Sequence, residues 1–305
     1  MTFKNLNSFN KNIFSQFGED GIIEEILNRL GRNSDKFCCE FGASDGEYLS
    51  NVYNLILNKN FKGVLIEADP KKFKNLLRNK NKNILPINKL VSFVGKNILD
   101  NILLEQNFKK DFDILSIDVD GNDYHIFEKI NQFKPKIIII EYNPTIPNEV
   151  EFIQKKDFNI SQGSSAKSLF NLAKRKNYSL IAATSTNIFF VHSDYKELII
   201  DKDYQLDEIR DDTLCKNYVF SGYDGTIYTS KKLHLPWHNF SVDQIKYLPK
   251  VLQKNPLYFN SLEQLLFYIY KFYNFPMKYF RRYGGFLLIY KKIKSIIKKK
   301  TFPHD

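Results

Sequence analysis

Oxygen-bearing side chains follow two predicted strands of this sequence, at the point where each strand ends. In an open α/β sheet, ligands bind beyond the carboxyl ends of the strands. A carboxylate there can act as a general base once burial or neighbouring carboxylates raise its pKa toward neutrality. Carboxylates can also bind a hard cation such as Mg²⁺. The side chains in question are Asp118, Asp120, Asp123, Glu141 and Asn143.

A glycine turn offers a second kind of site. A predicted strand carries Glu40 near its end, and Gly42 and Gly46 follow before a helix predicted over 48–57. Glycine lets the backbone bend and lets a ligand approach closely, and a helix N-terminus offers unpaired N–H groups to an anion. The next strand ends on Glu67, and an acid about 20 residues past such a turn commonly holds a ribose. The alternative is an ordinary buried strand and turn.

The Glu-x-Gly-x-x-x-Gly pattern resembles motif I of the class I S-adenosylmethionine (SAM) methyltransferases, with Glu67 in the place of their motif II acid. Gln16 and Glu19 either reach the mouth of this site or begin the next helix. Ser50 and Asn51, expected in the first turn of a helix, either contact a ligand carboxylate or cap the helix. The residues expected to bind SAM are Gln16, Glu40, Gly42, Ser44, Gly46, Ser50, Asn51, Glu67, Ala68 and Asp118.

Strand and helix patterns alternate along the first two thirds of the chain. Four consecutive isoleucines, residues 137–140, imply a strand buried on both faces, as in a parallel sheet. A short link at 184–186 joins the last two predicted strands as a hairpin. The sequence therefore predicts an α/β fold: a doubly wound, seven-stranded, mostly parallel, Rossmann-like sheet with a C-terminal α-rich extension. The predicted strands after Glu40 span 63–67, 84–91, 112–118, 136–143, 178–182 and 187–192.

Four short motifs, in this order, look like those of the FkbM-type methyltransferases, a branch of the class I SAM-dependent O-methyltransferases. The similarity covers roughly residues 14–191. Many members of that family act in bacterial glycan and polyketide pathways. Asp120 and Asp123 stand where the family usually has Glu, and Asn143 stands where it usually has His. The motifs are Phe41-Gly42-Ala43-Ser44-Asp45-Gly46, Val64-Leu65-Ile66-Glu67-Ala68-Asp69-Pro70, Ile117-Asp118-Val119-Asp120-Gly121 and Ile140-Glu141-Tyr142-Asn143.

The resemblance implies that the methyl group of SAM lies near the acids. Methyl transfer to a hydroxyl needs the acceptor oxygen about 3 Å from the methyl carbon and a base for its proton. Asp118 or Asp120 could be that base, and His125 is a further candidate that could equally be a helix-cap or surface histidine. Alternatively, Asp118, Glu141 and Asn143 hold Mg²⁺ or another divalent cation, as in catechol-type O-methyltransferases. The acids could also only bind substrate or stabilise the fold.

Composition limits the class of protein. The chain has 305 residues, 43% of them hydrophobic and 26% charged, which suits one large domain or one domain with an appendage. Its three cysteines lack metal-site spacing, and Cys38 and Cys39 are adjacent in a predicted buried strand, which indicates a reducing compartment. Residues 1–12 are polar, and no apolar run is long enough to span a bilayer. We therefore expect a cytoplasmic protein.

The positive charge is concentrated in the tail. From Gln264 onward the chain has ten Lys or Arg and one acid, whereas the rest has 35 basic and 33 acidic residues. A nucleic-acid groove across the main fold is therefore not expected. Over 286–300, apolar residues follow one helical face and lysines the other, as in a helix that lies on an anionic membrane. Alternatively, this helix packs on the body of the protein or on a second subunit, or it binds nucleic acid.

These observations predict a SAM-binding methyltransferase domain over 1–195, an accessory segment packing on it over 196–262, and an aromatic, basic tail over 263–305. The expected activity is methyl transfer to a sugar hydroxyl of a bacterial surface glycan, such as a capsule, or of its precursor. The acceptor would be a small molecule or a glycan. The tail would bring the enzyme to the inner face of the cytoplasmic membrane. The alternatives are a non-catalytic, membrane-docked glycan-binding protein and an RNA methyltransferase.

Overall fold

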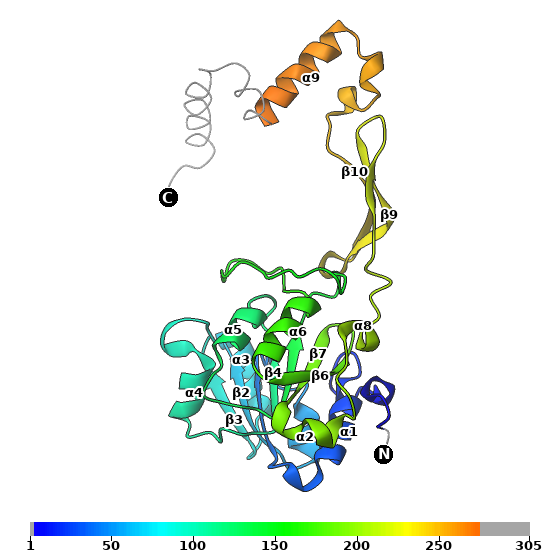
Figure 1. Cartoon of the computed structure of the whole chain (residues 1–305). Coiled ribbons are helices and arrows are strands. Elements are labelled where there is room, and N and C mark those ends of the chain that lie inside the picture. The colour runs from blue at the N-terminus through cyan, green and yellow to red at the C-terminus, as the bar shows by residue number, and fades with distance from the viewer. Residues whose placement is uncertain (1–2, 275–305) are drawn as a thin grey trace. The chain divides into compact units, whose positions relative to one another are not determined.

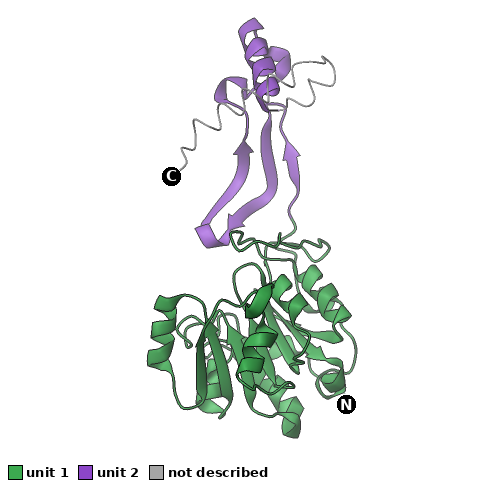
Figure 2. Ribbon diagram, turned by 90° about the vertical axis from the view of Figure 1, so that its left-hand side faces the viewer, with its two compact units in different colours: residues 1–216 green, residues 217–305 purple. Residues whose placement is uncertain are grey.

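The computed structural model of the chain describes residues 3–274 and divides into two compact units (Figure 2). Unit 1 comprises residues 1–216 and unit 2 comprises residues 217–305. The sequence placed a boundary after residue 195, whereas the structure divides after Lys216. The segment 196–216 belongs to unit 1 because Leu206 and Ile209 are buried in its core.

In the described part of unit 1, the strands form one seven-stranded sheet in the order β3-β2-β1-β4-β5-β7-β6 (Figure 1). The first five in this order pair in parallel, and β7 pairs antiparallel with both β5 and β6. This confirms the predicted sheet and its terminal hairpin. The strands are β1 (Phe37–Phe41), β2 (Lys62–Glu67), β3 (Ile84–Asn88), β4 (Ile114–Ile117), β5 (Ile137–Glu141), β6 (Tyr178–Ala183) and β7 (Asn187–His192).

Helices cover both faces of the sheet and build two hydrophobic cores (Figure 1). Side chains of α1, α2, α3 and α7 pack in one core, and those of α4, α5, α6 and α8 pack in the other. Because strand side chains alternate between faces, Ile137 and Ile139 lie in the first core, and Ile138 and Ile140 in the second. The helices are α1 (Glu19–Leu30), α2 (Tyr53–Asn58), α3 (Pro70–Asn79), α4 (Leu99–Glu105), α5 (Asp123–Lys129), α6 (Ala166–Arg175), α7 (Lys196–Ile199) and α8 (Leu206–Ile209).

The prediction of a helix over 48–57 was wrong at its start, because α2 begins only at Tyr53. Leu49 has a φ of 60°, in the left-handed region that interrupts a right-handed helix. Ser50 then accepts the backbone N–H groups of Val52 and Tyr53 with its hydroxyl oxygen, at 3.2 and 3.0 Å. Ser50 therefore precedes the helix and its N-cap residue Val52, rather than lying in the first turn.

In the described part of unit 2, three antiparallel strands are followed by a longer helix. The strands are β8 (Val219–Ser221), β9 (Thr226–Leu235) and β10 (Phe240–Lys246), in the order β10-β9-β8. The helix is α9 (Ser261–Asn274), which contains the aromatic, apolar beginning of the predicted tail. Within residues 3–274, no helix combines the length and the apolar character needed to cross a bilayer. The membrane helix predicted over 286–300 lies outside the described residues.

Gly42 brings the turn after β1 against the end of β4. Its φ is 75°, and a Cβ built on it would lie 1.7 Å from the carbonyl oxygen of Asp118. A backbone carbonyl cannot move away as a flexible side chain can, so only glycine permits this contact. Gly42 therefore sets the position of Asp118 relative to the first turn of the sheet.

We predict that Gly42→Ala destabilises the protein far more than the same change at Gly95, whose φ is 71° and whose added Cβ would meet nothing within 4 Å. The control should lose about 1 kcal/mol for an alanine in the left-handed region. Gly42→Ala should lose about 1–3 kcal/mol more, because the new methyl group overpacks the turn. Urea denaturation of both variants measures the difference. Equal losses would show that the contact with Asp118 does not constrain the turn.

Candidate active site

Glu40 anchors the loop that leads from the glycine turn into α2. Its carboxylate accepts the hydroxyl of Ser50 at 2.5 Å and the backbone N–H of Asn51 at 2.9 Å. The Asn51 amide in turn donates to the hydroxyl of Ser116 on β4, at 3.1 Å. Burial raises the pKa of Glu40 to about 7, although these donors act to lower it. The structure thus brings Glu40, Ser50 and Asn51 together in a buried hydrogen-bond network. This network fixes the loop between the glycine turn and α2.

Glu67 links the turns that follow β1 and β2. One carboxylate oxygen accepts the backbone N–H of Ser44 at 2.7 Å, and the other accepts that of Asp69 at 2.7 Å. The neighbouring Gly42 and Ala68 are both exposed. A carboxylate at the carboxyl end of β2, flanked by an exposed glycine with positive φ, fits the ribose of a nucleoside. Gly46, also with positive φ, is buried and packs near Leu65 and Leu76.

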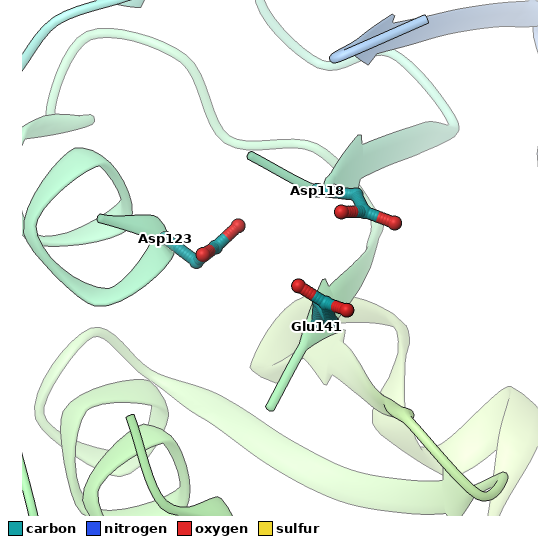
Figure 3. A group of neighbouring side chains, drawn as sticks. All are labelled: Asp118, Asp123 and Glu141. Atoms are coloured by element: carbon teal, nitrogen blue, oxygen red, sulfur yellow. The ribbon is translucent and has the colours of Figure 1, made fainter. Parts of the chain in front are cut away.

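Three carboxylates converge at the ends of β4 and β5 (Figure 3). They belong to Asp118, just past β4, to Asp123 at the start of α5, and to Glu141 at the end of β5. One oxygen from each lies within 4.8 Å of the others. Asp123 also accepts the backbone N–H groups of Val119 and Gly121, each at 2.9 Å, and so fixes the turn between β4 and α5.

Crowding and burial raise the pKa of each of these acids. Burial and the charge of Asp120 raise the pKa of Asp118 to about 6. Burial and the charge of Asp118 raise the pKa of Asp123 to about 7. Burial and the charges of Asp118 and Asp123 raise the pKa of Glu141 to about 10. At neutral pH Glu141 is therefore protonated, and its carboxyl O–H donates to the carboxylate of Asp118.

Asp120, the second predicted base, stands at the rim of this cluster. Its side chain is exposed, and its φ of 54° lies in the left-handed region. Water can solvate an exposed carboxylate, whereas Asp118 is largely desolvated. Of the two predicted bases, Asp118 therefore has the environment that makes a carboxylate basic.

His125 and Asn143 have other partners. The His125 Nε2 lies 2.7 Å from the carbonyl oxygen of Gln154, and because a carbonyl only accepts, that nitrogen carries the proton. Asn143 accepts the N–H and hydroxyl of Thr145 and donates to the carbonyl of Gln162 at 2.7 Å. Both side chains thus hold the loop that follows β5. The carboxylates that the structure gathers are those of Asp118, Asp123 and Glu141, which adds Asp123 to the predicted Asp118 and Glu141. The side-chain oxygen of Asn143 accepts hydrogen bonds from Thr145 instead.

At the start of α1, Gln16 is exposed and Glu19 is fully buried. Glu19 accepts the hydroxyl of Thr184 at 2.6 Å and the side-chain amide of Asn187 at 3.1 Å. Asn187 pairs with Glu141 across β5 and β7, and the charge of Glu19 contributes to the raised pKa of Asp118. Glu19, which the sequence left either at the mouth of the ligand site or at the start of a helix, is the first residue of α1. Its spacing in the sequence did not reveal its partners, because they come from the distant hairpin.

The segment that contains the clustered acids also matches a known protein family. Residues 93–180 match the family model of the methyltransferase FkbM domain, and this segment contains β4, β5 and the three clustered acids. Residues 93–180 belong to an FkbM-type methyltransferase domain. Over these residues the match confirms the family predicted from the motifs, and it supports a methyltransferase. No curated protein sequence matches the chain.

Solved structures with a similar fold are distant in sequence. A SAM-dependent methyltransferase from Aquifex aeolicus is 10% identical, with 57% of this chain and 88% of that chain covered and a TM-score of 0.35. TYW2 of M. jannaschii in complex with AdoMet is 16% identical, with 60% of this chain and 79% of that chain covered and a TM-score of 0.30.

The raised pKa values of the acids predict how stability depends on pH. Between the unfolded and folded pKa values the folded FkbM domain binds more protons than the unfolded chain, so the free energy of unfolding should fall as pH rises from 5 to 9. Glu141→Gln keeps a donor toward Asp118 without needing a bound proton. We expect this variant to gain about 1–3 kcal/mol at pH 8 and less at pH 5.

Urea unfolding across this pH range measures the effect. Glu149→Gln is the matched control, since it makes the same change at an exposed side chain. If Glu141→Gln is no more stable than the parent at pH 8, the acids are not desolvated as described.

Proposed function

We propose that the protein is a SAM-dependent O-methyltransferase that transfers a methyl group to a sugar hydroxyl of a bacterial surface glycan or its precursor. The observation that supports this most is the pairing of ionised Asp118 with protonated Glu141 at the carboxyl edge of a methyltransferase sheet. The reaction needs a base at that edge, and this pair would supply one.

Residues at the ends of β1 and β2 would hold SAM. Glu67 would accept the ribose hydroxyls, and the exposed Gly42 and Ala68 would let the nucleoside approach the backbone. Glu40, Ser50 and Asn51 would hold the turn from beneath. When bound, SAM supplies an electrophilic methyl group on a sulfonium.

Asp118 would then take the proton of the acceptor hydroxyl. With a pKa of about 6 it is ionised near neutral pH, yet it is a stronger base than a carboxylate in water. Glu141 donates a hydrogen bond to Asp118 and so orients its carboxylate. Asp123 holds the turn that carries Asp118, through the N–H groups of Val119 and Gly121.

A divalent cation such as Mg²⁺ is the alternative way to activate the hydroxyl. Asp118, Asp123 and Glu141 would hold it, because their oxygens lie close enough together to share one ion. A bound cation would lower the pKa of the acceptor hydroxyl. It would also ionise Glu141, so the two versions differ in whether a chelator stops the reaction.

The sugar acceptor is proposed from the family resemblance and from the rim of the site. Many members of the family that the motifs resemble act in bacterial glycan and polyketide pathways. The exposed Asp120 can accept hydrogen bonds from sugar hydroxyls. We place the reaction in the cytoplasm, where precursors of surface glycans would be accessible.

We predict that the protein transfers labelled methyl groups from SAM to a cytoplasmic pool of glycan precursors, each acceptor gaining about 14 Da for one methylene. Asp118→Asn should lower kcat about 10²–10⁴-fold because the base is lost, while SAM still binds. Asp211→Asn, at an exposed aspartate with its own local hydrogen bonds, is the matched control.

Two further measurements distinguish a direct base from a bound cation, and a methyltransferase from a non-catalytic protein. If Asp118 is the direct base, transfer survives a chelator, whereas loss of transfer with the chelator favours the cation. If SAM binds but no glycan pool ever gains a methyl group, the activity proposed here is wrong and a non-catalytic glycan-binding role is favoured.

A further inference from the structure

One face of the helix α9 (Ser261–Asn274) packs on its own unit, and the described residues of that unit leave the other face exposed. On the packed side, the Phe267 ring lies 5.3 Å from that of Phe259, centroid to centroid, and the Tyr270 ring lies 6.1 Å from that of Tyr247. Glu263 pairs with Lys254 at 2.7 Å. Reciprocal hydrogen bonds of 2.9 Å between Asn260 and Glu263 also fix the start of the helix.

The opposite side of α9 is apolar and exposed. We call it the apolar face, and its side chains recur at the three- and four-residue spacing of one helical stripe. No charged residue lies within it, since Glu263 and Lys271 are on the packed side. The apolar face consists of Leu262 (64% exposed), Leu265 (56%), Leu266 (37%), Ile269 (55%) and Tyr273 (63%).

We expect this apolar face to bind a partner, because contiguous exposed apolar surface is costly in water and marks interaction sites. The charge of the residues that follow α9 indicates what kind of partner this would be. Residues 275–305 contain nine Lys or Arg and one acid, Asp305. An apolar stripe next to dense positive charge is complementary to a bilayer with anionic headgroups. A second copy of the chain fits less well, because it adds further positive charge, whereas an anionic bilayer supplies the opposite charge.

We propose that the apolar face of α9 lies in the interface of an anionic lipid bilayer. A helix of 14 residues is about 21 Å long, shorter than the roughly 30 Å hydrocarbon core, so it would lie along the surface rather than cross it. Tyr273, and Tyr268 beside the stripe, have the ring and hydroxyl that favour the headgroup region. This inference stands apart from the methyl transfer, although it would bring the enzyme to lipid-linked acceptors.

Co-sedimentation of the full chain with vesicles tests the proposal. We expect binding to phosphatidylcholine vesicles that contain phosphatidylserine, much weaker binding to pure phosphatidylcholine, and weakening by salt. The double variant Leu265→Gln and Ile269→Gln should lose about tenfold or more in affinity for the anionic vesicles. The matched control is Leu77→Gln with Leu104→Gln, which makes the same kind of change at exposed positions of α3 and α4 and should bind as the parent does.

Thermal melting curves of both double variants should overlay that of the parent, since the altered side chains are exposed. The proposal is overturned if the parent ignores anionic vesicles, or if the Leu265 and Ile269 variant binds them as well as the parent does. It is also overturned if light scattering shows a parent dimer that this variant converts to monomer without any vesicle binding by the parent, because a second copy would then cover the apolar face.

Discussion

The crowding of carboxylates at the ends of β4 and β5 is the constraint on which the site depends. Asp118, Asp123 and Glu141 cannot all be ionised in a largely desolvated space, so Glu141 keeps its proton and shares it with Asp118. This arrangement lowers stability above neutral pH, and hydrogen bonds from two of the neighbouring acids to other parts of the fold offset some of that cost. Asp123 holds the β4–α5 turn, and nearby Glu19 holds the hairpin of β6 and β7. The same side chains therefore build the site and raise the pKa values of one another.

The donor side of the site is built in the same way. Glu67 joins two turns through the N–H groups of Ser44 and Asp69, and Glu40 fixes the loop before α2. Gly42 lets the first turn touch the carbonyl of Asp118. Through this contact, the residues proposed to hold the nucleoside and those proposed to take the proton are set at a fixed relation within one unit.

Much of the fold could be predicted from the sequence because its strands have strong local signals. The isoleucines of β5 required burial on both faces, and the short link before β7 required a hairpin. The start of α2 could not be predicted, because the left-handed Leu49 and the bond from Ser50 to Glu40 are set by tertiary contacts. The same limit applied to Asn143, His125 and Glu19, whose partners lie in loops or in a distant hairpin. Motif spacing shows which residues reach one edge of the sheet. It does not show which of their side chains are already hydrogen-bonded to other parts of the fold.

The central claim is that a nucleoside methyl donor lies across the ends of β1 and β2 with its sulfur facing the acids of β4 and β5. A crystal structure of the protein with S-adenosylhomocysteine tests this most directly. We expect ribose hydroxyls on the carboxylate of Glu67 and a sulfur atom on the side of Asp118 and Glu141. A nucleoside bound at the opposite edge of the sheet, or one that leaves Glu67 untouched, would contradict it.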